Sequence, residues 1–201
     1  MREKFVAGLE HPVDEFQAKA MDILDQGASV LVAAPTGSGK TLVAEYAIHS
    51  ATVGGKRSFY TAPLKALSNQ KYRDLASIHG HANVGLVTGD NSINPDAHIV
   101  VMTTEVLRNM IYTGSARLDD LAVVVLDEVH FLQDAYRGPV WEEVIIQLPP
   151  EVQLVCLSAT VSNATEVAEW LSTVRGRTDA VVEQTRPVEL LTHFAYHDRA
   201  T

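Results

Sequence analysis

The sequence predicts an α/β domain built on a mostly parallel sheet with helices on both faces. Short apolar runs alternate with helix-like runs along the whole chain of 201 residues, and this alternation is typical of doubly wound α/β folds. Most of the apolar runs are continuous stretches of Val, Ile and Leu without polar alternation. Such runs indicate strands that are buried on both faces of a parallel sheet.

Each element follows from a local pattern. Between the apolar runs, apolar residues recur at helical spacing, as Phe16, Ala20 and Ile23 do in the first helix and Val167 and Leu171 do in the last. A polar residue at 162 or 163 is a suitable N-cap for that last helix. The expected strands are 30–34, 58–62, 83–88, 98–103, 121–127, 153–158 and 180–184. The expected helices are 14–26, 40–52, 64–78, 105–112, 140–148 and 163–173.

Composition limits the class of protein. Hydrophobic residues make up 46% of the chain, so it can bury a sizeable core. One cysteine, Cys156, excludes an internal disulfide and fits a reducing compartment. The N-terminus is charged and no apolar run is long enough to span a bilayer, so we expect a cytoplasmic protein without membrane contact. The net charge of −9 disfavours coating of nucleic acid by bulk charge but permits a local basic groove.

The motif Ala-Pro-Thr-Gly-Ser-Gly-Lys-Thr at residues 34–41 lies between an apolar run and a helix-like run. Glycines allow a tight turn whose N–H groups converge on one point, and the following helix adds a partial positive charge. Lys40 adds a full charge, and the Thr41 hydroxyl can hold Mg²⁺. We interpret the motif as a phosphate-binding loop; the alternative is a glycine-rich turn with an incidental lysine.

Two further groups follow apolar runs. Asp127 and Glu128 come directly after the run 121–126, where an acid could hold the metal and a second could polarise an attacking water. The alternative role for such a pair is capping of the next helix. His130 is placed to sense the γ-phosphate end rather than to serve structure alone. The Ser-Ala-Thr at 158–160 could exchange hydrogen bonds with a carboxylate or a histidine, or could cap a turn.

These motifs, in this order and separation, resemble the first RecA-like domain of a superfamily 2 DExH-box helicase. Three further segments, at residues 61–71, 88–90 and 103–109, resemble the nucleic-acid-contacting motifs of that family. Segments 137–143 and 186–190 are similar to the Ski-type RNA helicases. The resemblance extends over nearly the whole chain.

The resemblance implies ATP and Mg²⁺ as cofactors. Asp127 and Thr41 would hold Mg²⁺, and Glu128 would be the catalytic base. An upstream glutamine reads the adenine edge in this family, and a stacking aromatic residue that often precedes it is replaced here by His11. The residues that would bind the nucleotide are Gln17, Thr36, Gly37, Ser38, Gly39, Lys40 and Thr41. The residues that would couple nucleotide state to strand movement are His130, Ser158, Ala159 and Thr160.

The resemblance also implies contacts to single-stranded RNA, with DNA as an alternative. Loops after strands offer N–H groups and hydroxyls to phosphates without reading sequence. Lys71 and Arg73 would add positive charge, or would form a solvated helix face. The implied contact residues are Pro63, Leu64, Lys65, Gly89, Asp90, Thr103, Thr104 and Glu105.

The expected organisation has three parts. Residues 1–28 form an adenine-recognition segment, residues 29–190 form the RecA-like domain, and residues 191–201 lead toward a second RecA-like domain. Because that second domain supplies arginines to the transferring phosphoryl group, we expect a monomer with little activity of its own. The competing interpretations are a DNA repair helicase of the same superfamily and a non-catalytic, nucleotide-dependent binding module; a small P-loop kinase is a weaker option.

Overall fold

The computed structural model describes residues 2–159 and 163–185, which form an α/β domain around one sheet. The strand order is β4-β3-β5-β2-β6-β7-β1-β8, and neighbouring strands run parallel except for β3 and β4. The strands are β1 (Ser29–Ala33), β2 (Arg57–Ala62), β3 (Val84–Val87), β4 (Ser92–Ile93), β5 (Ile99–Thr103), β6 (Leu121–Leu126), β7 (Gln153–Ser158) and β8 (Thr178–Val182). The predicted fold class is confirmed.

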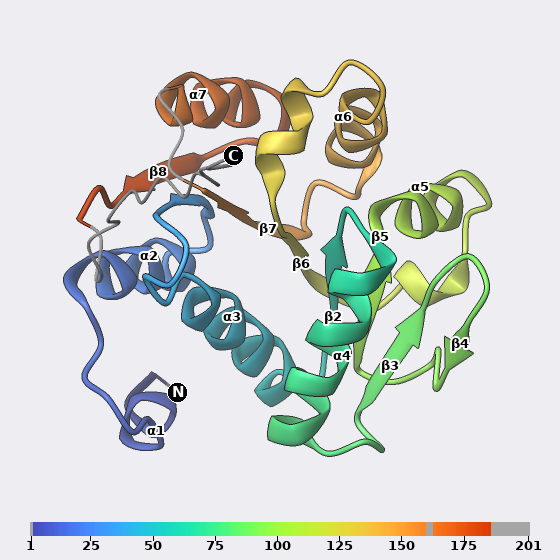
Figure 1. Cartoon of the computed structure of the whole chain (residues 1–201), viewed down its shortest axis with the longest axis horizontal. Coiled ribbons are helices and arrows are strands. Elements are labelled where there is room, and N and C mark those ends of the chain that lie inside the picture. The colour runs from blue at the N-terminus through green and yellow to red at the C-terminus, as the bar shows by residue number, and fades with distance from the viewer. Residues whose placement is uncertain (1, 160–162, 186–201) are drawn as a thin grey trace, which may run out of the picture.

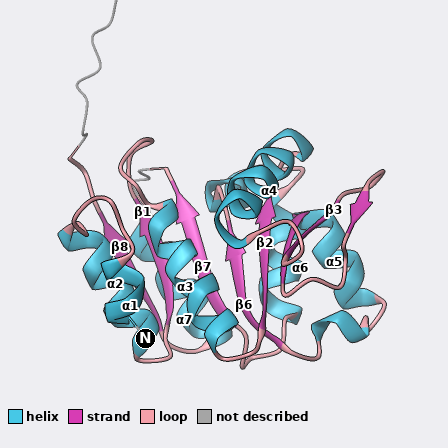
Figure 2. Cartoon of the chain, turned by 90° about the horizontal axis from the view of Figure 1, so that it is seen from below, coloured by secondary structure: helices cyan, strands magenta, loops and turns pink. Residues whose placement is uncertain are grey.

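Helices cover both faces of this sheet (Figures 1 and 2). The α-helices are α1 (Arg2–Ala7), α2 (Glu15–Asp25), α3 (Thr41–Val53), α4 (Lys65–His79), α5 (Thr104–Tyr112), α6 (Gly138–Gln147) and α7 (Ala164–Arg175). Two short 3₁₀ helices, η1 (Ala116–Leu118) and η2 (Val129–Gln133), lie on either side of β6 in the sequence.

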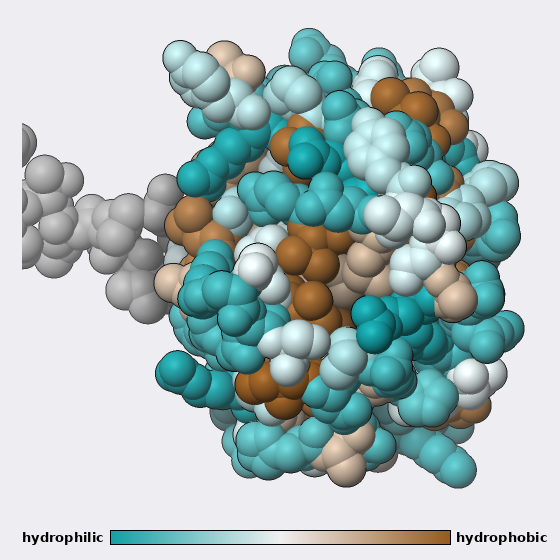
Figure 3. Space-filling model, turned by 90° about the vertical axis from the view of Figure 1, so that its right-hand side faces the viewer, coloured by the Kyte–Doolittle hydropathy of each residue, from teal (hydrophilic) through white to brown (hydrophobic). Residues whose placement is uncertain are grey.

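Alternation along each strand divides the core into two layers. In β1, Val30 and Val32 pack in the cluster that contains α2, α3 and α4, whereas Leu31 and Ala33 pack in the cluster that contains α5, α6 and α7. Successive strand residues point to opposite faces, so continuous apolar strands are required when both faces are covered. Figure 3 shows the surface of the molecule from the right-hand side of Figure 1. Hydrophilic residues dominate this surface, and apolar residues appear between them.

The element boundaries differ from the predicted ones in a few places. The last strand begins at Thr178 rather than at residue 180, because it starts soon after Gly176, whose φ of 88° ends α7. As the edge strand beside β1 it tolerates polar residues, which hid its start from an apolar pattern. Helix α6 begins two residues earlier than predicted, with a proline in its first turn. The short elements α1 and β4 lack an apolar run and were not predicted.

Cys156 lies on β7 and is fully buried, as predicted. Burial raises the pKa of its thiol to about 12, with a small opposing effect from Arg175. The thiolate is therefore strongly disfavoured in the folded chain, and this cysteine is a core residue rather than a nucleophile. Among the described residues, no helix has the length and apolar character needed to cross a bilayer.

The sheet order gathers the loops into two groups at the carboxyl edge of the parallel strands. Strands β6, β7 and β1 are neighbours and lead into the acid pair, the Ser-Ala-Thr segment and the glycine-rich loop. Strands β3, β5 and β2 are neighbours and lead into the three segments that resemble nucleic-acid motifs. Strands β2 and β6 join the two groups.

Candidate nucleotide and nucleic-acid sites

The glycine-rich loop connects the end of β1 to the start of α3. Gly37 and Gly39 have φ values of 85° and 81°, in the left-handed region that glycine adopts without strain. Within the described part of the chain, the amides of Gly37, Gly39 and Lys40 donate to no acceptor. Free, convergent amides at a helix N-terminus form a binding site for an anion such as a phosphate.

A pocket of about 470 Å³ lies between this loop and the segment that precedes α2. His11 is in its wall, so the imidazole is available to stack on a base that enters there. The pocket combines backbone of the loop with both apolar and polar side chains, as small-molecule sites do. The lining residues are Leu9, Glu10, His11, Pro12, Asp14, Gln17, Gly37, Ser38, Gly39, Thr41, Leu42 and Glu45.

Gln17 joins α2 to the glycine-rich loop. Its side chain is 5% exposed, its Nε2 donates to the carbonyl of Gly39 over 3.0 Å, and its Oε1 accepts from the amide of Asp14 over 2.9 Å. The second bond is half of a capping box at the start of α2. Since an amide has two donor hydrogens and two acceptor lone pairs, Gln17 keeps one of each for a further partner. Reading of adenine by Gln17 therefore stays a prediction that the hydrogen bonds allow.

Asp127 follows β6 and is 8% exposed. Its Oδ2 accepts from the hydroxyl of Tyr60 over 2.6 Å, and its Oδ1 accepts from the amide of Glu128 over 3.0 Å. Burial, and then the Asp127 carboxylate, raise the pKa of Tyr60 well above its usual value. Tyr60 was not singled out from the sequence, although a tyrosine inside an apolar strand signals a buried hydroxyl that needs a partner.

The chemistry of this corner suits Mg²⁺. The Thr41 hydroxyl and the Asp127 carboxylate are hard oxygen donors, which Mg²⁺ prefers. Each carboxylate oxygen of Asp127 accepts one hydrogen bond from the described residues and retains lone-pair capacity for a metal-bound water. The residues present therefore fit the ion that the motifs predict.

Glu128 has a left-handed backbone, with φ of 56° and ψ of 44°. This conformation is uncommon for a residue with a Cβ, and such strain is found at functional sites. Its carboxylate Oε2 lies 3.2 Å from Nδ1 of His130. The imidazole of His130 in turn stacks on Phe131, with ring centroids 4.8 Å apart. The Glu128 side chain makes no cap hydrogen bond at the start of η2, whereas the Asp127 carboxylate accepts from the Glu128 amide there.

Ser158 ends β7 and lies beside the start of the glycine-rich loop. Its carbonyl accepts from the amide of Ala34 over 3.2 Å. Its hydroxyl is buried without a partner among the described residues, and it borders the same small cavity as His130. An unpaired buried hydroxyl is costly, so it is available to a group that arrives with the nucleotide. Ala159 follows directly, and Thr160 lies outside the described residues.

The candidate nucleic-acid residues lie at the same edge of the sheet. Pro63, Leu64 and Lys65 follow β2, and Lys65 begins α4. Lys65 is paired with Asp90, which also accepts from the Thr88 hydroxyl over 3.1 Å. The remaining candidates are Gly89, after β3, and Thr103, Thr104 and Glu105, at the junction of β5 and α5.

Asp90 is the ion-pair partner of Lys65 in this structure. The hydrogen bond from Lys65, followed by that from Thr88, lowers the pKa of the Asp90 carboxyl, so it is negatively charged. Both side chains are more than half exposed, so this ion pair constrains Lys65 only weakly. Thr104, by contrast, is buried and its hydroxyl has no partner among the described residues.

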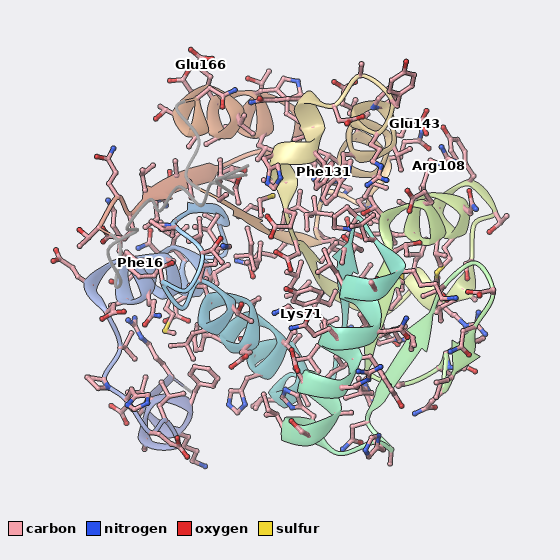
Figure 4. All side chains as sticks on the ribbon, in the orientation of Figure 1. Phe16, Lys71, Arg108, Phe131, Glu143 and Glu166 are labelled. Atoms are coloured by element: carbon pink, nitrogen blue, oxygen red, sulfur yellow. The ribbon has the colours of Figure 1, made fainter. Side chains whose placement is uncertain are left out.

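Lys71 makes a contact that the sequence did not indicate, and its positive charge toward nucleic acid stays a prediction. Its Nζ lies 5.8 Å from the centre of the Tyr60 ring, in a cation–π contact. Figure 4 shows this side chain directed from α4 into the space between α3 and α4. Lys71 therefore covers Tyr60 and is not simply part of a solvated helix face.

The fold and this loop together define a RecA-like, P-loop nucleotide-binding domain. A family model for the DEAD/DEAH box helicases matches residues 14–167, and the chain belongs to that family. The resemblance to Ski-type helicases is confirmed, because similar proteins include such helicases.

Two relatives illustrate this similarity. The chain is 56% identical over 191 residues to "Probable helicase HelY" of Mycobacterium tuberculosis, covering 95% of this chain and 21% of that protein. It is 49% identical over 179 residues to "Antiviral helicase SKI2" of Saccharomyces cerevisiae, covering 89% of this chain and 14% of that protein. The chain thus spans about a fifth, or less, of the length of these curated relatives.

Solved structures are similar in fold. The helicase Lhr of Mycobacterium smegmatis, bound to ssDNA and AMP-PNP, matches with a TM-score of 0.68 and 29% identity, over 91% of this chain and 27% of that chain. A hypothetical ATP-dependent RNA helicase from Sulfolobus tokodaii matches with a TM-score of 0.69 and 20% identity, over 91% of this chain and 57% of that chain. The second match concerns the fold alone.

Proposed function

We propose that this chain is the ATP-binding motor domain of a DExH-box RNA helicase, which couples ATP hydrolysis to movement along single-stranded RNA. The observation that carries the proposal is that both groups of loops lie at the carboxyl ends of the parallel strands. The nucleotide group of loops, after β1, β6 and β7, adjoins the nucleic-acid group of loops, after β2, β5 and β3. A motor needs both ligands on one rigid scaffold so that a change at one is felt at the other.

The proposed roles follow the chemistry of each group. The amides of the glycine-rich loop and Lys40 bind the phosphates, and Thr41 and Asp127 hold Mg²⁺, largely through water. Mg²⁺ neutralises charge on the phosphates when bound. Glu128 acts as the base toward the attacking water, and His130 and Ser158 respond to the γ-phosphate. His11 and Gln17 receive the adenine.

We propose further that the domain works as a monomer, in the cytoplasm, beside a second RecA-like domain of a longer protein. The short fraction of each relative that this chain spans supports a multidomain parent. An arginine from a second domain is worth on the order of 10³–10⁵ in rate. The 201 residues alone should therefore hydrolyse ATP at least about 10³-fold more slowly than a version extended by that domain.

Single-turnover hydrolysis, with and without RNA, measures this difference. The proposal requires slow, RNA-independent hydrolysis by the chain and RNA-stimulated hydrolysis by the extended version. Strong RNA-stimulated turnover by the 201 residues alone would contradict the need for a second domain. Absence of MgATP binding by the chain would contradict the nucleotide site itself.

A DNA helicase is the second candidate. It is favoured by the 29% identity to a helicase whose solved structure holds ssDNA. The name of a relative from Arabidopsis thaliana that is 49% identical over 199 residues, a DExH-box ATP-dependent RNA helicase, favours an RNA substrate. Competition between RNA and DNA oligonucleotides of the same sequence separates the two, since mostly phosphate contacts would give only a modest preference. The third interpretation, a binding module without catalysis, predicts that a version with a second RecA-like domain binds ATP but does not hydrolyse it, whether or not Glu128 is present.

Two lysines that flank β2 test the proposed nucleic-acid edge. Lys65 follows the strand and Lys56 precedes it, so Lys65 lies at the carboxyl ends of the parallel strands and Lys56 at their amino ends. Each pairs with one aspartate, Asp90 and Asp120 respectively, and each side chain is 52% exposed. Lys65→Ala should weaken RNA binding about 5- to 10-fold and reduce the slope of log Kd against log salt by about 1, because one phosphate contact is lost.

Fluorescence anisotropy with a labelled RNA at several salt concentrations measures both quantities. Lys56→Ala is the matched control, and it should leave affinity and slope unchanged. Equal effects of the two substitutions would mean that the RNA follows net charge rather than this edge.

A further inference from the structure

Asp127 is held by two hydrogen bonds that come from different parts of the chain. The amide of Glu128, its neighbour in sequence, donates to Oδ1 over 3.0 Å. The hydroxyl of Tyr60, on β2, donates to Oδ2 over 2.6 Å. Within residues 2–159 and 163–185, Tyr60 is the only side chain that donates to this carboxylate. Two donors on the two oxygens fix both the position and the plane of the carboxylate.

The bond between Tyr60 and Asp127 is buried and short. Tyr60 is 1% exposed and Asp127 is 8% exposed. An O–H···O distance of 2.6 Å lies in the range of charge-assisted hydrogen bonds, which are about twice as strong as neutral ones. Removal of the hydroxyl would leave Oδ2 with less than its full set of partners in a site that water reaches poorly.

Tyr60 is itself held on several sides. The backbone of β2 is paired with β6, with Tyr60 opposite Val125, and the ring is 1% exposed, so the strand and the surrounding core together position the hydroxyl. The Nζ of Lys71, on α4, lies 5.8 Å from the centre of the Tyr60 ring. Figure 4 shows the Lys71 side chain directed into the space between α3 and α4. Tyr60 is thus positioned by its strand and contacted by a side chain of α4.

The same bond crosses between the two groups of loops at the sheet edge. Asp127 belongs to the nucleotide group, after β6, whereas β2 ends at Ala62 and leads into Pro63 and Lys65 of the nucleic-acid group. A second link, from the amide of Asp127 to the carbonyl of Thr61 over 3.0 Å, runs parallel to it. Two hydrogen bonds thus connect the end of β2 to Asp127.

We propose that Tyr60 is a positioning residue for Mg²⁺: its hydroxyl orients the Asp127 carboxylate toward the metal and ties that carboxylate to the strand that leads into the nucleic-acid loop. This proposal rests on the proposed function, since it requires Asp127 to hold the metal of bound MgATP. Tyr60 contacts neither nucleotide nor metal and acts through Asp127.

A purely structural role for Tyr60 is the competing explanation, and a second tyrosine provides the matched control. Tyr46, on α3, is also 1% exposed, and its hydroxyl is hydrogen-bonded to a carboxylate, that of Asp25. Asp25 ends α2 and lies outside the nucleotide pocket. Tyr46→Phe and Tyr60→Phe therefore remove the same chemical group from a buried ring, although Asp25 is exposed and Asp127 is buried, and only one of the two bonded acids is the candidate metal ligand.

The experiment measures the Kd of a fluorescent ATP analogue with Mg²⁺ and with EDTA, for the chain and for both variants. The ratio of the two values reports the contribution of the metal. Tyr60→Phe should reduce this ratio about tenfold, because a charge-assisted hydrogen bond is lost. It should leave the Kd in EDTA within about twofold, since the amides and Lys40 are intact. Tyr46→Phe should leave both values unchanged, although each variant should lower the Tm by several degrees.

The outcomes separate the inference from the function on which it rests. A chain that binds no nucleotide overturns the proposed function and this inference together. A chain whose Mg²⁺ dependence is unaffected by Tyr60→Phe overturns the inference alone, as does an equal loss of Mg²⁺ dependence in Tyr46→Phe. A loss confined to Tyr60→Phe supports it.

Discussion

Glu128→Gln is expected to reduce ATP hydrolysis about 10³-fold while leaving the Kd for MgATP unchanged, within the 10²–10⁴ that a general base contributes. The substitution keeps the size of the side chain and removes its ability to accept a proton. Glu128 is suited to this role because its strained left-handed backbone, with φ of 56°, presents the carboxylate beside His130 at 3.2 Å. Single-turnover hydrolysis in the chain, and steady-state turnover in a version with a second RecA-like domain, measure the effect.

Glu166→Gln is the matched control for this prediction. Glu166 is an exposed residue of α7, on the opposite side of the sheet from α3, and Figure 4 shows it at the outer surface of its helix. This variant should hydrolyse ATP at the parental rate. If Glu128→Gln turns over as fast as the parent, the base is another group and the role proposed for Glu128 is wrong.

Lys40→Ala is expected to raise the Kd for MgATP about 100-fold, which corresponds to about 2.7 kcal/mol. Lys40 begins the turn into α3 and stands next to amides that have no acceptor among the described residues. An ammonium group in such a nest binds the β- and γ-phosphates, and its loss removes charge-assisted hydrogen bonds of about 1.5–3 kcal/mol. Titration with a fluorescent nucleotide measures the change, and circular dichroism checks that the variant is folded.

Lys56→Ala, at the opposite edge of the sheet, is the control for Lys40→Ala and should bind MgATP as the parent does. The loss should be smaller for ADP than for ATP, because ADP lacks the γ-phosphate. An equal loss for both nucleotides would indicate that Lys40 supports the loop rather than the terminal phosphate.

Much of the fold was predictable because its strands are buried on both sides. A strand such as β7, whose residues from Leu154 to Leu157 are all apolar and buried, is visible as a run, and its predicted bounds of 153–158 are those observed. Edge elements carry a weaker signal, since one side or one face meets solvent. This explains the shift at β8 and the failure to predict the two-residue β4.

Part of the candidate site was also visible in the sequence. The glycine-rich loop and the acid pair are local motifs, in which a few consecutive residues carry the chemistry. The contacts of Tyr60 with Asp127 and with Lys71 were not recognised, because the first partner is tens of residues away and the contacts form only across β2, β6 and α4. Likewise, the pairing of Lys65 with Asp90 joins two candidate phosphate contacts that the sequence could only name separately.

By itself, the sequence determined the class of this protein: a parallel α/β domain with a phosphate-binding loop, followed by an acid pair. Such features depend on the order of neighbouring residues, because apolar runs, turns and helix starts are set by local backbone preference. Only the tertiary structure decided which loops are neighbours. It also decided that Gln17 donates a hydrogen bond to the glycine-rich loop and that Tyr60 donates one to Asp127. Hydrogen bonds and contacts between distant segments depend on strand order and on burial, which no stretch of sequence specifies alone.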